Sequence, residues 1–330
     1  MRGNVKTTAI HVRSIVGHPV TLRREWASPF LHLAKIKISL LATLSTATGY
    51  LLATGKITID MLVPTGAVFL LACGSCALNQ YQEREIDRWM ERTRSRPIPS
   101  GRLNPETALW VSLGLILSGA LILFFGAGDL ALALGLFAVL WYNLVYTPLK
   151  QKTAFAAVPG ALVGAIPPAL GWVAGGGEIL DPRIGGVALF FFIWQIPHFW
   201  LLLLDASKDY ENAGLPSITR FFSTRQIKRI VFIWLLSTGV SALTFPSIGL
   251  IHFHSVYFFL FAATIWFIWN AIIFSRSQTV EVSSRFTFMK LNAYVLSVIF
   301  LLSFDRLLSS SYTALNLISR MLTLIGFKLV

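Results

Sequence analysis

The chain is poor in charge for its length. Of its 330 residues only 13% are Asp, Glu, Lys or Arg, whereas 55% are hydrophobic, and the mean hydropathy is +0.67. Soluble domains carry roughly 25% charged residues, so this composition excludes an ordinary soluble protein. Apolar runs of about 20 residues recur throughout, which is the length that a bilayer-spanning helix needs. We therefore predict an all-α polytopic membrane protein, since no alternation of the kind that barrel strands require is evident.

Cysteine is scarce as well. The only two, Cys73 and Cys76, have the C-x-x-C spacing, which alone is weak evidence for redox or metal chemistry. They lie in a stretch of small residues that favours close packing of membrane helices. We interpret them as packing residues, because no further cysteine could complete a four-ligand site. The sequence also lacks a convincing Ser-His-Asp or Cys-His set, which argues against a nucleophilic side chain.

Acidic residues are outnumbered by basic ones. There are 15 Asp and Glu residues against 28 Lys and Arg residues, which gives a net charge of +13. In a membrane protein, positive charge usually marks the cytoplasmic loops. The basic balance therefore does not predict a nucleic-acid partner; the lipid bilayer is the expected surrounding.

Apolar run length predicts a nine-helix transmembrane domain over residues 31–308. A basic tail precedes it over 1–30, and a C-terminal tail over 309–330 has apolar residues at a spacing typical of an interfacial helix. We expect no cleavable signal peptide, and we interpret the basic tail as cytoplasmic rather than as an organellar transit peptide. A bacterial plasma membrane is thus favoured over a mitochondrial inner membrane. The nine spans are predicted near 33–54, 61–80, 108–126, 130–148, 154–174, 185–204, 229–250, 254–274 and 290–308.

The loops indicate an orientation. With the N-terminus inside, 21 of the Lys and Arg residues fall in cytoplasmic segments and 5 in external ones. The positive-inside rule then predicts a cytoplasmic N-terminus. Two acidic clusters, described next, face the cytoplasm in this orientation.

The first acidic cluster follows the second span. Asn79, Glu83 and Asp87 are four residues apart, so on a continuous helix they lie close to one stripe. Carboxylates beside a membrane span are expensive unless they bind something, and carboxylate and amide oxygens suit Mg²⁺. The simpler interpretation is a solvated acidic helix end balanced by neighbouring arginines.

The second cluster, Asp205 and Asp209 with Lys208 between them, follows the sixth span. Each cluster leads into a charged loop with a Pro-Ser step, which suggests a weak internal repeat, and repeat proteins often bind substrate where the repeats meet. A metal held between two such clusters could neutralise a diphosphate leaving group. We predict all five residues of the two clusters as metal-binding and catalytic.

Basic side chains surround the first cluster. Arg92 and Arg96 lie in a loop that Pro and Gly residues make rigid, and the planar fork of Arg matches phosphate oxygens. On the same side of the membrane, Lys150 and Tyr146 are predicted as further substrate contacts. Membrane topology alone also accounts for these positive charges.

His198 lies deep in the sixth span, within Pro-His-Phe-Trp. An intramembrane histidine is a functional candidate, and it could ligate a haem iron or accept a proton. The structural alternative is a histidine that caps carbonyls freed by Pro197.

Together these motifs resemble the UbiA superfamily of intramembrane prenyltransferases, over residues 35–305. The match includes the acidic motifs, which are common to the superfamily, and Arg-Thr-Arg-Ser-Arg-Pro-Ile-Pro-Ser-Gly over 92–101. The segments Pro-His-Phe-Trp over 197–200 and Lys-Asp-Tyr-Glu-Asn-Ala-Gly over 208–214 are similar to its haem-modifying branch. One departure is Glu83, where many members have Asp; it keeps the charge and adds one methylene.

The resemblance implies a ring of nine helices around a central cavity, with both acidic motifs at its cytoplasmic mouth. It implies farnesyl diphosphate and haem B as substrates, Mg²⁺ as cofactor and haem O as product. A haem A synthase or a terminal oxidase is an implied partner. The resemblance also implies residue roles. Mg²⁺ and diphosphate would be bound by Asn79, Glu83, Asp87, Asp205 and Asp209. Diphosphate or propionate groups would be contacted by Arg92, Arg96 and Lys208, and His198 would be a haem ligand.

Three alternatives stay open at this point. A prenyltransferase acting on an aromatic quinone precursor would use the same acidic motifs. A carboxylate-based secondary transporter would place its acids near mid-membrane, whereas here they lie at the ends of spans, beside arginines. A non-catalytic assembly factor would leave both clusters unexplained.

Overall fold

The apolar runs are helices in the computed structural model, which describes residues 29–277 and 280–324. This part of the chain contains no strand, and nine of its helices are long and apolar enough to cross a membrane. The predicted all-α class is therefore confirmed. The principal helices are α2 (Ile36–Thr54), α3 (Leu62–Gln82), α4 (Arg84–Trp89), α5 (Pro105–Gly126), α6 (Asp129–Leu140), α7 (Thr147–Leu149), α8 (Ala157–Gly160), α9 (Leu162–Ala174), α10 (Pro182–Asp205), α11 (Ser207–Asn212), α12 (Thr224–Leu243), α13 (His254–Arg276) and α14 (Val280–Leu324).

Capping residues explain where several spans begin. The side chains of Asn104 and Asp181 accept hydrogen bonds at the starts of α5 and α10, each followed by a proline at the first helical position. Ser223 and Gln226 form a capping box at the start of α12. The predicted span 229–250 was wrong at its end, since α12 ends at Leu243 and a short 3₁₀ turn, Pro246–Ile248, follows.

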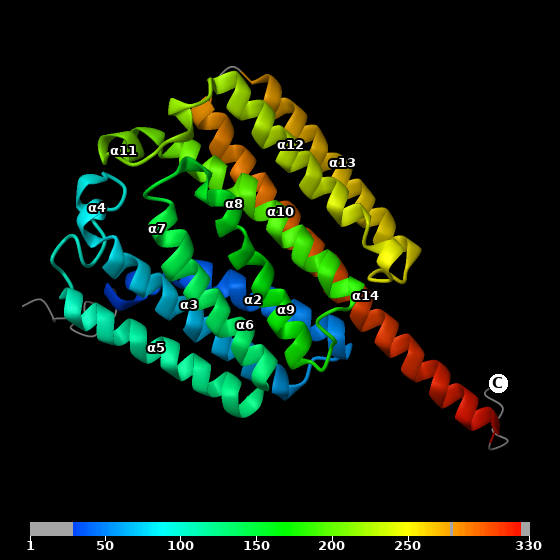
Figure 1. The fold of residues 1–330 in the computed structure, drawn as a ribbon. Helices are drawn as coiled ribbons and strands as arrows, with labels where there is room; N and C mark the ends of the chain where they lie inside the picture. Colours follow the sequence, from blue (N-terminus) through cyan, green and yellow to red (C-terminus); the bar gives the residue numbers. More distant parts are fainter. Residues whose placement is uncertain (1–28, 278–279, 325–330) are drawn as a thin grey trace, which may run out of the picture.

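The helices pack side by side with their connecting loops at the two ends of the bundle (Figure 1). Helix α2 packs against α3 and α9, and α10 packs against α9, α12 and α14. Large apolar side chains stay exposed along the outward faces of α5 and α13, as expected for helices that face lipid. Helices α4 and α11 lie at the same end of the bundle (Figure 1).

Two glycines let α2 and α9 approach at backbone distance. A Cβ added to Gly171 would lie 1.9 Å from the carbonyl oxygen of Thr46, and one added to Gly49 would lie 1.9 Å from that of Pro168. Small residues at helix crossings allow this approach in membranes. The contact fixes one wall of the bundle.

Gly171→Ala is expected to destabilise the protein by about 1–3 kcal/mol, because the added methyl overlaps backbone atoms that cannot rotate away. Gly114→Ala is the matched control, since Gly114 is also in a helix and has no atom within 4 Å of an added Cβ. Thermal unfolding in detergent measures both. Equal melting temperatures for the two variants would contradict the close contact.

Helix α14 ties the other end of the bundle together. The buried carboxylate of Asp305 accepts hydrogen bonds from the backbone N–H groups of His252 and Phe253 at the start of α13 and pairs with the His252 ring at 2.8 Å. Arg306 donates to the carbonyl oxygens of Leu52 and Ala53 near the end of α2. The helix continues through residue 308 to Leu324, and Figure 1 shows this end projecting from the bundle.

Candidate active site

The first acidic cluster lies where α3 turns into α4. We predicted one continuous helix, but α3 ends at Gln82 and Glu83 leaves the helical conformation with φ −97° and ψ 3°. The amide of Glu83 still donates to the Asn79 carbonyl at 3.0 Å, and that of Asp87 donates to the Glu83 carbonyl at 2.8 Å. The three side chains therefore still line one cavity, and all three are buried.

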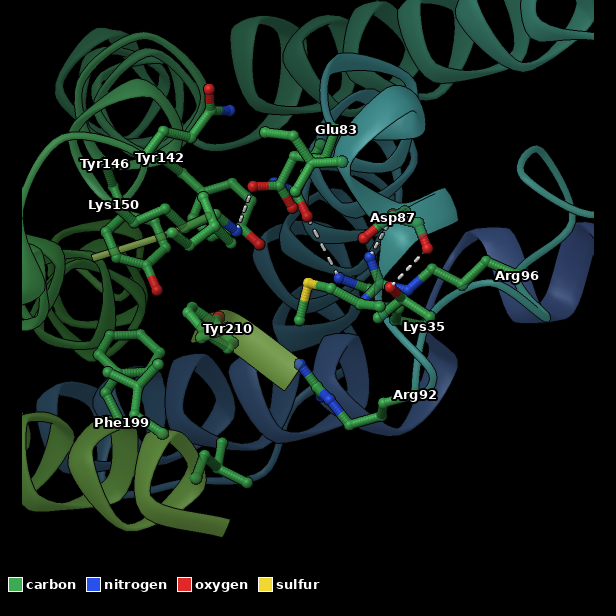
Figure 2. A pocket seen from close by; sticks show the side chains of 18 of the residues that line it. Lys35, Glu83, Asp87, Arg92, Arg96, Tyr142, Tyr146, Lys150, Phe199 and Tyr210 are labelled. Carbon is green, nitrogen blue, oxygen red and sulfur yellow. Dashed lines mark hydrogen bonds and ion pairs between the residues drawn. The ribbon is translucent and has the colours of Figure 1, made fainter. Parts of the chain in front are cut away.

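Each carboxylate of this cluster is paired with a cation (Figure 2). Glu83 Oε1 lies 2.7 Å from Lys150 Nζ, and Asp87 Oδ2 lies 2.6 Å from Arg96 Nη1. The loop that carries Arg96 is held by the Thr93 hydroxyl, which donates to the Asp87 carbonyl oxygen at 3.0 Å. Buried charges need such partners, so the acids and bases position one another.

Asn79 connects three elements. Its Nδ2 donates to Thr147 Oγ1 at 3.1 Å, and its Oδ1 accepts from Lys35 Nζ at 3.3 Å. Lys35 has φ 45°, the one positive φ of a non-glycine residue in the described part of the chain. Gln80 holds this turn, because its Nε2 donates to the carbonyl oxygens of His32 and Leu33. A lysine in a left-handed conformation is strained, and such strain is concentrated at functional sites.

A π-helical turn, Trp141–Tyr146, shapes the opposite wall. It is held by Trp141 Nε1, which donates to the Pro159 carbonyl at 2.8 Å. The rings of Tyr142 and Tyr146 stack at 5.6 Å, and Tyr146 stacks on Phe199 of α10 at 5.3 Å. All three rings line the cavity, and π turns occur often at functional sites.

The second acidic cluster is divided by a helix break. Helix α10 ends at Asp205, Ala206 has φ −108° and ψ 14°, and α11 follows. Asp205 and Lys208 are exposed, and neither they nor Asp209 line the cavity. Asp209 Oδ2 instead accepts from the Arg92 amide at 3.0 Å. This bond brings the two motifs together at the rim of the cavity.

The cavity is small and rich in positive charge. Its volume is about 180 Å³, and it is lined by Lys35, Arg92, Arg96 and Lys150 against Glu83 and Asp87. Sites for drug-sized ligands measure roughly 300–1,000 Å³, so this space fits an anionic head group rather than a whole prenyl chain or macrocycle. The excess of cations favours an anion such as diphosphate.

Two lysines outside the membrane spans have shifted pKa values. Burial lowers the pKa of Lys35 to about 8, helped by the neighbouring charges of Arg96 and Lys150. Burial alone would also lower the pKa of Lys150, but the Glu83 carboxylate overcomes this and raises it. Lys150 is therefore a permanent cation of the cavity.

His198 is placed away from this cavity, on the side of α10 that faces α14. Its Nδ1 lies 3.1 Å from Asn292 Oδ1, and its ring contacts Trp194 and Phe288. The next residue, Phe199, lines the cavity. Two neighbouring residues of α10 therefore have different surroundings: His198 faces α14, and Phe199 lines the cavity.

Sequence reasoning missed Lys35 and Thr147 as members of this group. Lys35 lies inside the predicted span 33–54, where a charged side chain costs free energy. That cost was the sequence feature that could have marked Lys35 as a functional residue. The structure starts α2 at Ile36, which leaves Lys35 at the mouth of the cavity. Thr147 carries no such signal, because its role depends on the π turn before it.

The donor set suits magnesium. Asn79, Glu83 and Asp87 offer oxygen ligands within one cavity, whereas no group of three or more His, Cys, Asp or Glu side chains gathers anywhere in residues 29–277 and 280–324, this cavity included. Mg²⁺ is commonly bound through one or two carboxylates together with substrate phosphates, not by a complete protein cage. The residues present therefore fit a metal that arrives with a diphosphate.

The fold and the two motifs define an intramembrane helical enzyme of one class. The family model described as the UbiA prenyltransferase family matches residues 42–294, and the chain belongs to this family. The fold agrees: the chain is similar to a digeranylgeranylglyceryl phosphate synthase structure, with a TM-score of 0.67 at 18% identity, covering 86% of this chain and 99% of that one. A UbiA homologue from Archaeoglobus fulgidus bound to GPP and Mg²⁺ gives a TM-score of 0.63 at 16% identity, covering 84% and 99%.

Curated relatives point to one member of the class. A protoheme IX farnesyltransferase from Geobacter sulfurreducens is 40% identical over 220 residues, covering 67% of this chain and 81% of the relative. The protein of the same name from Oleidesulfovibrio alaskensis is 39% identical over 215 residues, covering 65% and 76%.

Proposed function

We propose that the protein transfers a farnesyl group from farnesyl diphosphate to a vinyl group of haem B, which gives haem O. The observation that carries this proposal is the cation-rich cavity with two buried, ion-paired carboxylates. It belongs to a chain whose relatives at 40% and 39% identity are named protoheme IX farnesyltransferase.

The diphosphate binds in the cavity. Lys35, Arg96 and Lys150 converge there with Arg92 at the rim, and they stabilise the charge that collects on the leaving oxygens. Because Glu83 and Asp87 already fix Lys150 and Arg96, the cations are positioned before the substrate arrives. Preorganised charge of this kind lowers the barrier without reorganisation during the reaction.

Asn79, Glu83 and Asp87 would hold Mg²⁺ together with the diphosphate, with Asp209 at the rim as a further oxygen donor. Asp205, which is exposed outside the cavity, is not included in this set. Bound Mg²⁺ supplies Lewis-acid stabilisation of the departing diphosphate.

The transfer needs no nucleophilic side chain. The C1–O bond of farnesyl diphosphate breaks, and its electron pair leaves with the diphosphate. The vinyl π electrons of haem form the new bond to C1, and water adds to the resulting cation and releases a proton to solvent. The rings of Tyr142, Tyr146 and Phe199 present π faces that tolerate the allylic cation and exclude water from it.

The acceptor binds within the membrane beside α10, with His198 as the iron ligand.

The excess of Lys and Arg in the loops at the cavity end supports a cytoplasmic N-terminus and a cytoplasmic cavity mouth. The bacterial relatives support the plasma membrane as the location. A haem A synthase or a terminal oxidase would use the product.

Acceptor competition tests the proposal. Membranes containing the protein would receive isotope-labelled farnesyl diphosphate, Mg²⁺ and equal amounts of haem B and 4-hydroxybenzoate. The expected result is label in the extracted haem fraction alone. Label in the aromatic acid would instead support the quinone-precursor alternative, and label in neither, with folded protein, would reject both.

Lys35→Met is expected to raise the KM for farnesyl diphosphate by about tenfold, since one charge-assisted contact is worth roughly 1.5–3 kcal/mol. The KM for haem should stay unchanged. Lys37→Met, on the exposed side of the same segment, is the control. A KM for the diphosphate that is unaltered in Lys35→Met would remove Lys35 from the binding site.

A further inference from the structure

A polar pair joins α10 to α14 inside the membrane. His198 Nδ1 lies 3.1 Å from Asn292 Oδ1, and Asn292 Nδ2 donates to the Phe288 carbonyl oxygen at 2.9 Å. The second bond fixes the orientation of the amide, because the opposite orientation would set the Asn292 oxygen against the Phe288 carbonyl oxygen. The amide oxygen therefore faces the imidazole.

This orientation determines the tautomer of the histidine. Asn292 Oδ1 can only accept, so the bond requires that Nδ1 of His198 carries the hydrogen. In the neutral ring, Nε2 then has the free lone pair. Metal-binding histidines commonly donate their other ring N–H to a partner that sets tautomer and ring direction.

The surroundings hold the ring in place and leave Nε2 available. The imidazole lies between Trp194, at 4.9 Å between ring centroids, and Phe288, at 4.7 Å. His198 is half-buried, and Nε2 has no hydrogen-bond partner among the described residues. The buried Nε1 of Trp194 likewise has no partner in that part of the chain. Unsatisfied buried donors are rare, so this wall has the features of a site that a ligand completes.

We propose that Asn292 is a positioning residue: it holds His198 in the Nδ1–H tautomer, so that Nε2 ligates the iron of a haem-type macrocycle bound beside α10 and α14. This inference rests on the proposed function, because that function supplies the macrocycle. It adds two features to that function: Nε2 of His198 is the atom that binds the iron, and Asn292, on another helix, sets the tautomer of the histidine.

Haem binding by the purified full-length protein in detergent tests the inference. Optical titration with haem B would give the affinity, and resonance Raman spectra of the ferrous complex would give the iron–imidazole stretch. Asn292→Leu is expected to weaken haem binding by about 10–100-fold, the usual effect of losing such an outer partner. Asn292→Asp still accepts from Nδ1–H, so it should restore affinity and raise the stretch frequency, because a carboxylate makes the imidazole a stronger donor.

Asn270→Leu is the control for loss of an amide elsewhere in the bundle: Asn270 also donates to the carbonyl four residues earlier in a span, accepts from Lys290 Nζ at 2.6 Å and does not contact His198. It should bind haem as the wild type does. Unchanged affinity and stretch in Asn292→Leu, or equal losses in Asn292→Leu and Asn292→Asp with lowered melting temperatures, would overturn the positioning role. Haem binding and spectra that survive in His198→Ala would overturn it as well. Farnesyl transfer by the wild type, measured in parallel, tests the proposed function independently of the role of Asn292.

Discussion

Asp87→Asn is expected to lower the rate of farnesyl transfer by at least about 10²–10³-fold. Asp87 is buried in the cavity and paired with Arg96 at 2.6 Å. The amide that replaces the carboxylate keeps the size and can still accept from Arg96, so the fold should persist. It loses the charge that orients Arg96 and contributes to the proposed magnesium site.

Steady-state assays with purified protein, over a range of Mg²⁺ concentrations, measure this effect. Glu85→Gln is the matched control, because Glu85 is an exposed acid of the same helix whose ion pairs within the described part of the chain are with Arg84 and Arg88. Its activity should equal that of the wild type. If both variants kept full activity at low Mg²⁺, the first acidic motif would have no part in catalysis.

Lys150→Gln is expected to reduce kcat/KM for farnesyl diphosphate by about 100-fold. The substitution removes the Lys150 cation, which stays charged because Glu83 raises its pKa. The Nζ of Lys150 also lies over the Tyr146 ring, 5.4 Å from its centroid. It also leaves Glu83 buried without its partner, which destabilises the fold because one half of a buried ion pair remains.

A double variant separates these two effects. Glu83→Gln combined with Lys150→Gln should recover the melting temperature lost in the single variant but not the activity. Lys152→Gln is the control, since Lys152 is an exposed lysine of the same loop. Activity that returned together with stability in the double variant would show that Lys150 only neutralises Glu83.

The sequence was sufficient for those features that depend on composition over long segments. Hydropathy predicted the spans because lipid requires about 20 apolar residues in each. Spacing predicted that Asn79, Glu83 and Asp87 would lie together, and they do, because the backbone hydrogen bonds continue through the break at Glu83. Charge in the following loop predicted the approach of Arg96.

Features that depend on local backbone conformation were beyond the sequence. The break at Ala206, between Asp205 and Asp209, has no adjacent proline or glycine that would predict it. The left-handed conformation of Lys35 depends on Gln80, which lies 45 positions away in the sequence and donates hydrogen bonds to the preceding turn. The pairing of His198 with Asn292 spans 94 positions and follows from how α14 packs on α10, which hydropathy does not specify.

Mass spectrometry of the haem product tests the central claim most directly. Membranes containing the wild-type protein would be incubated with haem B, farnesyl diphosphate and Mg²⁺, with Asp87→Asn membranes in parallel. The account predicts a new haem heavier than haem B by one farnesyl group and one hydroxyl, formed only by the wild type and only with Mg²⁺. Unaltered haem B alone, recovered with folded protein and intact farnesyl diphosphate, would contradict it.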